Sequence, residues 1–320
     1  MVIEKSYSID VLKFILSCCV VALHYNWELI PRGYLSVEFF FIISGFSFYR
    51  FSNMRSTNPI KIIKKIYLIY IASIILTILL ASSKYDILSI VLASLMMQSL
   101  GINDTVINVP TWFLCVYAFV VPCIVYAYNF MDKRGVKCEY ILLLVPILIY
   151  FILSNSTPST GFNYSYEFKV AGLTVGILRC IAAVCIGIFS GVVSEGVSID
   201  KRVSNPLSIT LFAWIVYIFS FSGFYPSYDY VSISIMAMML ILIVSGNNIV
   251  SFILDRTGRR FPFLGKLSVY VFIFHYPILT VINEGGRITA LKVVIILLTA
   301  ATLFNKERII SLFVSAKRPS

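Results

Sequence analysis

Lys13, His24, Glu38 and His275 carry ionisable side chains inside stretches that are otherwise almost entirely apolar, aromatic or small. Lys13 and His24 bound the sequence KFILSCCVVALH, and their spacing of eleven residues is about three helical turns plus 20°. The two side chains are therefore predicted to share one helix face, about 16 Å apart along the axis. A histidine with a nearby carboxylate, such as that of Glu38, can act as a general base near neutral pH. Ionisable groups in a hydrophobic interior are costly, and they indicate a functional site.

Lys13 and His24 also have ordinary structural interpretations. A lysine about one turn inside a membrane can extend its ammonium group toward the nearer surface. His24 precedes Tyr25 and Trp27, and these three rings can form an aromatic belt at a membrane surface. Because two incidental residues would have no reason to share a helix face, the spacing favours a polar column inside a helix bundle.

Glu38 and His275 have structural alternatives too. Glu38, in YLSVEFFFIISGF, can pair with Arg32 at the rim of the bundle. His275, in LSVYVFIFHYPIL, can be a packed, hydrogen-bonded ring at a kink made by Pro277. The order of the apolar stretches nevertheless places both residues in the same half of the bundle as His24.

Arg179 and two lysines are candidates for binding an anion. Arg179 lies in the stretch GILRCIAAVCIGIFSG, where it needs an anionic partner, either a protein carboxylate or the phosphate of a ligand. The segment 50–65 holds five basic residues and no acidic ones, and it includes Lys61 and Lys64. Such a segment is explained by the preference for positive charge in cytoplasmic loops, or by phosphates of a nucleotide-bearing donor.

Thr111 and Trp112, in VPTWFLC, supply a hydroxyl and an indole at the predicted depth of Glu38. They are candidate substrate-binding residues for that reason.

The composition identifies a membrane protein. Of the 320 residues 59% are hydrophobic and 13% are charged, and the mean hydropathy is +0.91. A soluble domain carries about 25% charged residues. Long apolar runs without strict alternation favour helices over a membrane β-barrel. The sequence therefore predicts an all-α, polytopic helical membrane protein, organised as one domain over residues 1–320.

Ten membrane-spanning helices are predicted, with both termini in the cytoplasm. An eleventh apolar stretch, 86–100, is the shortest, and we expect it to be re-entrant or interfacial. The segments of residues 131–138 and 250–263 are expected to be basic cytoplasmic loops. The predicted spans are 8–26, 34–50, 64–82, 109–130, 139–154, 170–194, 207–224, 229–249, 264–283 and 288–304.

The net charge of +11 follows from this topology. Most of the 26 Lys and Arg residues fall in the predicted cytoplasmic segments. The predicted outer segments hold only Arg32, Lys84, Lys169 and Arg287. The basic character is therefore mainly a topology signal, and a nucleic-acid partner is not expected. The seven cysteines contain no CxxC spacing, so neither a metal site nor a disulfide framework is predicted.

These motifs resemble the acyltransferase 3 family of integral-membrane acyltransferases along nearly the whole chain. Lys13 stands where arginine is commoner in that family, Glu38 where aspartate is common, and KIIK (61–64) where an arginine pair is usual. The matching segments, in order, are SIDVLKFILSCCVVALH, EFFFIISGF with Ser44, KIIK, PTWFL, LRCIAAVCIGIFSG and LGKLSVYVFIFHYPIL.

The resemblance implies a membrane O-acyltransferase, most simply an O-acetyltransferase, in the inner membrane of a bacterium. The donor substrate would be acetyl-CoA or another acyl-CoA, with no permanently bound cofactor and no metal. The acceptor would be a sugar hydroxyl of a surface polysaccharide or of its lipid-linked precursor. Membrane lipids are the other expected partners.

The resemblance also implies roles for the site residues. His24 would deprotonate the acceptor hydroxyl, oriented or charge-stabilised by Glu38. Direct transfer and an acyl-enzyme intermediate are both open. The residues implied in catalysis are His24, Glu38, Lys13 and His275. Those implied in donor binding are Lys61, Lys64, Arg179 and Ser44. Those implied in acceptor binding are Trp112 and Thr111.

The alternative function is a proton-coupled transporter or flippase of lipid-linked sugars, in which the same residues relay protons. Against it, neither an inverted repeat nor paired broken helices are visible in the sequence. A polysaccharide polymerase is disfavoured by the short predicted outer loops.

Overall fold

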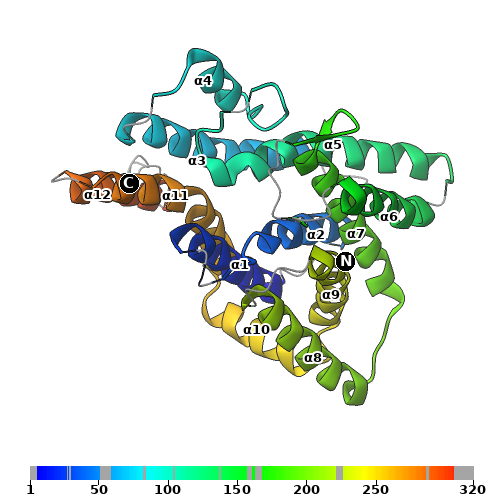
Figure 1. The fold of residues 1–320 in the computed structure, drawn as a ribbon. Helices are drawn as coiled ribbons and strands as arrows, with labels where there is room; N and C mark the ends of the chain where they lie inside the picture. Colours follow the sequence, from blue (N-terminus) through cyan, green and yellow to red (C-terminus); the bar gives the residue numbers. More distant parts are fainter. Residues whose placement is uncertain are drawn as a thin grey trace, which may run out of the picture.

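The computed structural model describes residues 6–26, 28, 30–50, 59–81, 84–103, 105–136, 138–156, 161–162, 168–220, 226–285 and 288–305. These residues are mostly helical (Figure 1). The helices are α1 (Tyr7–Tyr25), α2 (Leu35–Arg50), α3 (Pro59–Leu80), α4 (Ile87–Ser94), the 3₁₀ helix η1 (Val109–Thr111), α5 (Trp112–Lys133), α6 (Cys138–Ser156), α7 (Val175–Gly196), α8 (Lys201–Ser220), α9 (Pro226–Ser245), α10 (Ile249–Arg260), α11 (Leu264–Glu284) and α12 (Thr289–Phe304). The strands β1 (Lys169–Val170) and β2 (Leu173–Thr174) form a short antiparallel hairpin, in which Lys169 pairs with Thr174.

The long helices confirm the predicted polytopic membrane protein. Eight of the described helices are long and apolar enough to cross a membrane, namely α1, α3, α5, α6, α7, α8, α9 and α11. The helices α2 and α12 cover the other two predicted spans with 16 residues each, which is about 24 Å. Each of the ten predicted apolar spans therefore corresponds to a helix.

Two further helices are too short to cross a membrane. α4 has eight residues, about 12 Å, so the stretch 86–100 does not span a bilayer of about 30 Å. α10 forms in the basic segment that is expected between two spans, and no helix is predicted there from the sequence. Its exposed Ile249 and Phe252 and its terminal Arg259 and Arg260 make a mixed surface. A twelve-residue helix of this kind contains no long apolar run, so hydropathy alone does not reveal it.

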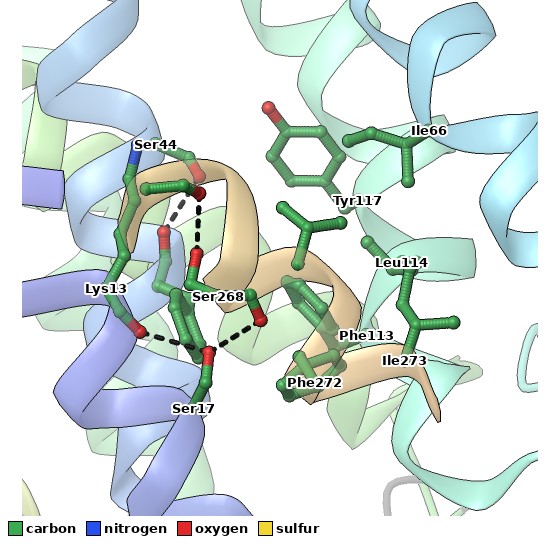
Figure 2. Close-up of a pocket in the computed structure, with 13 residues that line it drawn as sticks. Lys13, Ser17, Ser44, Ile66, Phe113, Leu114, Tyr117, Ser268, Phe272 and Ile273 are labelled. Atoms are coloured by element: carbon green, nitrogen blue, oxygen red, sulfur yellow. Dashed lines mark hydrogen bonds between the residues drawn. The ribbon is translucent and has the colours of Figure 1, made fainter. Parts of the chain in front are cut away.

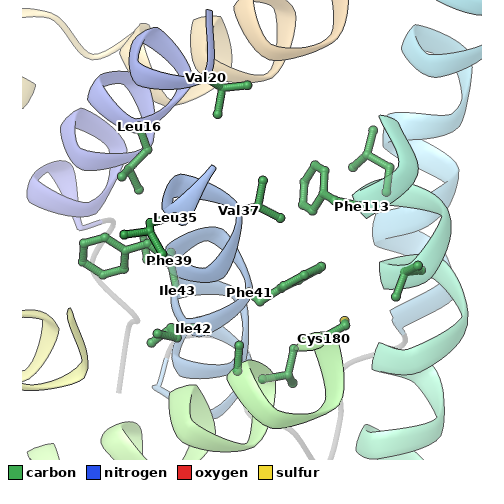
Figure 3. Packing of buried hydrophobic residues seen from close by; sticks show 14 of the residues in the cluster. Leu16, Val20, Leu35, Val37, Phe39, Phe41, Ile42, Ile43, Phe113 and Cys180 are labelled. Atoms are coloured by element: carbon green, nitrogen blue, oxygen red, sulfur yellow. The ribbon is translucent and has the colours of Figure 1, made fainter. Parts of the chain in front are cut away.

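α2 lies in the centre of the bundle, with buried side chains on all sides (Figure 3). A helix that is apolar all round is expected to be enclosed by others. Its contact with α7 is close, because a Cβ atom on Gly45 would overlap the carbonyl oxygen of Val184. A Cβ atom on Gly187 would likewise overlap the carbonyl oxygen of Ile42. These glycines let the two backbones touch. The buried α2 residues include Leu35, Val37, Phe39, Phe41, Ile42, Ile43 and Phe46.

The two ends of the bundle differ in chemistry. At one end, here termed the histidine end, α1 finishes and α2, α5 and α7 begin, so that His24 and Glu38 lie there. At the other, termed the basic end, α1, α3 and α11 begin and α2 finishes, with Arg50 and the exposed Lys61. Arg50 pairs with Glu195 at 3.1 Å, which joins the last turns of α2 and α7.

Candidate functional site

The chain's two histidines meet at the histidine end. Their ring centroids are 5.3 Å apart, and the ring planes are inclined by 35°. His24 lies in the last turn of α1, where its side chain is exposed, whereas His275 is buried within α11. The structure therefore pairs one surface imidazole with one interior imidazole.

His275 has one ring nitrogen in use and one without a partner. Its Nδ1 lies 2.7 Å from the carbonyl oxygen of Phe272 and 3.2 Å from that of Val271. Because a carbonyl only accepts, Nδ1 carries a hydrogen, and in the neutral ring Nε2 then holds a lone pair. Nε2 is buried, and no hydrogen-bond partner for it occurs in the described part of the chain. The structural alternative for His275 was a packed ring with its hydrogen bonds made. Only Nδ1 has such a bond here, and Nε2 is available to accept a proton.

A cavity of about 210 Å³ lies among α1, α2, α3, α5 and α11 (Figure 2). One wall is polar and consists of Lys13, Ser17, Ser44 and Ser268. Figure 2 shows the Lys13 side chain extending along this wall toward Ser44. The serine hydroxyls donate to main-chain carbonyls, as Ser17 does to Ser268 at 2.9 Å, so their oxygens can still accept hydrogen bonds. Two predicted site residues, Lys13 and Ser44, therefore line one cavity.

The remaining cavity wall is apolar and leads toward the histidines. The ring of Phe272 lies in this wall and also contacts the ring of His275, with centroids 6.1 Å apart. Lys13 and His24 both face α11, as their spacing predicts: Lys13 shares the cavity with α11, and His24 meets His275. The apolar lining consists of Phe40, Ile66, Phe113, Leu114, Tyr117, Val269, Phe272 and Ile273.

Glu38 forms a buried ion pair with Arg179, so the alternative pairing with Arg32 is wrong. Arg179 Nε donates to Glu38 Oε1, and both side chains are at most 3% exposed. Arg179 Nη1 donates to the carbonyl oxygen of Phe162 at 3.1 Å, and its guanidinium lies 5.3 Å from the ring centres of Phe162 and Trp112. Glu38 Oε2 and Arg179 Nη2 have no partner among the described residues. The anionic partner that Arg179 requires is thus a protein carboxylate.

Arg32 pairs instead with Asp229 of α9, at 2.8 Å and with both side chains buried. The hydroxyl of Tyr34 donates to the same carboxylate at 3.0 and 3.1 Å, and the Phe162 N–H donates to it at 2.8 Å. The main chain of Phe162 therefore joins two ion pairs, because its carbonyl binds Arg179. Asp229 is not among the predicted site residues. Its position inside an apolar stretch was the available signal, because a carboxylate there needs a partner.

Trp112 begins α5 beside this network, and Thr111 ends η1 directly before it. Trp112 flanks the Glu38–Arg179 pair, whereas Thr111 is fully buried in a separate set of hydrogen bonds. The Thr111 hydroxyl donates to the carbonyl of Asn108 at 2.7 Å and accepts from Gln98 at 2.8 Å. The Asn108 amide in turn donates to an α11 carbonyl at 3.1 Å. Asn108 thus joins the segment before α5 to α11, and Thr111 bonds to Asn108 within that segment.

Lys61 and Lys64 lie exposed on the first turns of α3, at the basic end. Ile66, less than one turn further along, lines the cavity. Arg179 lies near the start of α7, at the histidine end. The structure therefore does not bring Arg179 to the two lysines, and the predicted donor-binding group divides between opposite ends of the bundle.

The comparisons with known proteins give one family. No curated protein and no solved structure matches the chain. A family model described as an acyltransferase domain matches residues 6–304, which include both histidines and the whole cavity lining. The chain therefore belongs to the acyltransferase 3 family and is a membrane acyltransferase.

Proposed function

We propose that the protein transfers a short acyl group, most simply acetyl, from cytoplasmic acyl-CoA to a sugar hydroxyl of a surface polysaccharide or of its lipid-linked precursor. The membrane would be the inner membrane of a bacterium. The observation that carries this proposal is the buried, unpartnered Nε2 of His275 beside His24. A neutral imidazole nitrogen of this kind is suited to take the proton of an attacking hydroxyl.

The charge distribution supports a cytoplasmic basic end, because cytoplasmic segments carry an excess of Lys and Arg. Lys61 and Lys64 are exposed there, and they would meet the phosphates of the donor. The cavity of about 210 Å³ is smaller than the roughly 300–1,000 Å³ of typical small-molecule pockets. It therefore suits the narrow thioester-bearing arm beside Lys13 and Ser44, with the nucleotide outside at the two lysines.

Lys13 and His24 are about 16 Å apart along α1. A base and an oxyanion-stabilising group must both lie about 3 Å from the reacting atoms. Lys13 therefore cannot stabilise an oxyanion formed at the histidine pair, and we assign it to holding the donor.

In the transfer step, we assign the base to His275 in place of His24: the acceptor hydroxyl gives its proton to Nε2 of His275 while its oxygen attacks the thioester carbon. The new C–O bond forms, the C–S bond breaks, and the proton passes from the histidine to the leaving thiolate. The products are the O-acyl sugar and CoA-SH. A two-step route, with the acyl group held briefly by an imidazole nitrogen, gives the same products.

Glu38 and Arg179 are positioning residues in this proposal. Their buried ion pair anchors the main chain of Phe162 and lies against Trp112, and this fixes the start of α7 beside α2. Trp112, whose buried ring packs against Arg179 at the same end of the bundle, is the residue that we assign to the acceptor sugar.

The test uses inside-out membrane vesicles, which expose the cytoplasmic face, supplied with acetyl-labelled acetyl-CoA and a glycan acceptor. We expect label in the glycan and an equal amount of free CoA thiol, and neither in vesicles without the protein. A flippase would instead move the lipid-linked sugar across the membrane and leave the label in acetyl-CoA, which would refute the proposal.

A further inference from the structure

Three phenylalanine rings from three helices meet in the apolar wall of the cavity. Phe40 of α2, Phe113 of α5 and Phe272 of α11 all line it. Their ring centroids are 5.9 Å apart for Phe40 and Phe113, 5.6 Å for Phe40 and Phe272, and 4.9 Å for Phe113 and Phe272. Each ring thus contacts both others, and Figure 2 shows Phe113 and Phe272 next to each other. These three residues are termed the phenylalanine triad.

The triad lies between the proposed donor site and the proposed proton acceptor, His275. On one side are Lys13 and Ser44, which share the cavity with the triad. On the other side is His275, whose ring contacts that of Phe272. Phe113 and Phe272 are buried, with 9% and 4% of their surface exposed, and Phe40 is half-buried, so the three rings pack against one another beside His275. Phe272 therefore contacts both the donor cavity and the ring that carries the unpartnered Nε2.

We propose that the phenylalanine triad is the barrier between the donor cavity and the histidine pair, and that it selects short acyl groups. This inference rests on the proposed acyl transfer. While the rings are in contact, water at the histidine end cannot reach the thioester and hydrolyse it to a carboxylic acid and CoA-SH. Rotation of the ring side chains opens the barrier, and the size of the opening limits the acyl chain that passes.

The selectivity follows from the apolar character of the barrier. One methylene group in a hydrophobic site changes the preference between two substrates by about 10- to 200-fold. The wild-type protein is therefore expected to use acetyl-CoA well and butanoyl-CoA, with two more methylenes, poorly. Removing one ring widens the barrier and lowers this preference.

The first experiment replaces Phe113 or Phe40 by alanine and measures kcat/KM with acetyl-CoA and with butanoyl-CoA. Each substitution should lower the preference for acetyl at least about tenfold. It should also raise the release of CoA thiol when no acceptor is present. Phe48→Ala is the matched control, because Phe48 is a buried α2 ring that does not line the cavity. Unchanged preference and unchanged CoA release in both triad variants would overturn the proposal.

The alanine variants remove a large buried side chain, so Phe113→Leu and Phe40→Leu are tested in parallel with Phe48→Leu. These variants keep most of the apolar volume and should show the same changes to a smaller degree. A triad variant with the melting temperature of the Phe48→Leu control and the wild-type preference for acetyl-CoA over butanoyl-CoA would count against the barrier.

A second experiment needs no acyl transfer. Ser44→Cys places a thiol in the cavity, and a membrane-impermeant maleimide is added from the histidine end, with the Ser44 parent protein as the background. Labelling of this cysteine should be slow with the triad intact and at least several-fold faster with Phe113→Ala. Equal rates would contradict the barrier. Failure of the wild type to transfer acyl groups, with labelling still dependent on Phe113, would refute the proposed function and leave the barrier supported.

Discussion

The ring of His275 lies 5.3 Å from the ring of His24, although one belongs to the helix that opens the described chain and the other to α11. The main-chain carbonyl of Phe272 holds the Nδ1 hydrogen of His275 and so leaves Nε2 as the basic nitrogen. We expect His24, on the exposed side, to pass a proton between this nitrogen and the surface. The two imidazoles are thus expected to act as a unit.

Binding of acyl-CoA is predicted to depend on the positive charge of Lys13 rather than on the shape of its side chain. Lys13→Ala should raise the KM for acyl-CoA and lower activity, because the cavity then loses its cation. Lys13→Arg keeps the charge, matches the residue that is commoner in the family, and should retain activity. Steady-state kinetics of both variants with varied acyl-CoA check this, and equal activity of the alanine and arginine variants would rule out the role.

Breaking the Glu38–Arg179 pair is predicted to destabilise the protein. Arg179→Ala leaves a carboxylate buried without its cation, at a cost of about 3–5 kcal/mol. Thermal unfolding in detergent should show a clearly lower melting temperature for Arg179→Ala. The double variant Glu38→Gln with Arg179→Gln should recover part of the lost stability.

The surface pair Arg50–Glu195 is the matched control for this prediction, because its side chains are 30% and 51% exposed. Arg50→Ala should cost about 0–1 kcal/mol. An equal loss from both single alanine substitutions would show that burial of the ion pair is not what matters.

The α2–α7 contact predicts different effects for two glycines of one helix. Gly187→Ala places a Cβ atom against the carbonyl of Ile42, and the resulting separation of the helices should cost about 1–3 kcal/mol. Gly196→Ala meets no atom within 4 Å and should be neutral or slightly stabilising. The melting temperatures of the two variants check this, and similar values would contradict the close packing.

The orientation of the chain gives a further prediction. A reporter fused after Ser320 should report the cytoplasm, and one inserted near Thr157 should report the outside. Both positions lie outside the described residues, so their placement rests on the distribution of basic residues alone. Two reporters on the same side of the membrane would contradict the ten-span topology.

The membrane spans and the polar column of Lys13 and His24 were predictable because their signals are local. A long apolar run or an ionisable residue within one is visible in a short window of sequence, as at Lys13 and His24. The eleven-residue spacing correctly placed both side chains toward one neighbouring helix, here α11.

The partners of the charged residues were not predictable in the same way. Arg179 is far from Glu38 in sequence, and only the packing of α7 on α2 brings them together. The same holds for Arg32 and Asp229. The phenylalanine triad has no sequence signature, because the chain contains 25 phenylalanines in similar apolar surroundings.

The role of the histidine pair is tested by measuring acyl transfer by His275→Ala, His24→Ala and the double variant, in vesicles supplied with labelled acetyl-CoA. Thr280→Ala is the control, because Thr280 is about one turn beyond His275 and its hydroxyl bonds within its own helix. We predict that each histidine variant loses about 10²- to 10⁴-fold in rate. The rate of the double variant should be little lower than that of either single variant, because the effects of substituting residues that act as a unit do not add. Near wild-type transfer by the double variant would contradict proton transfer by the histidine pair.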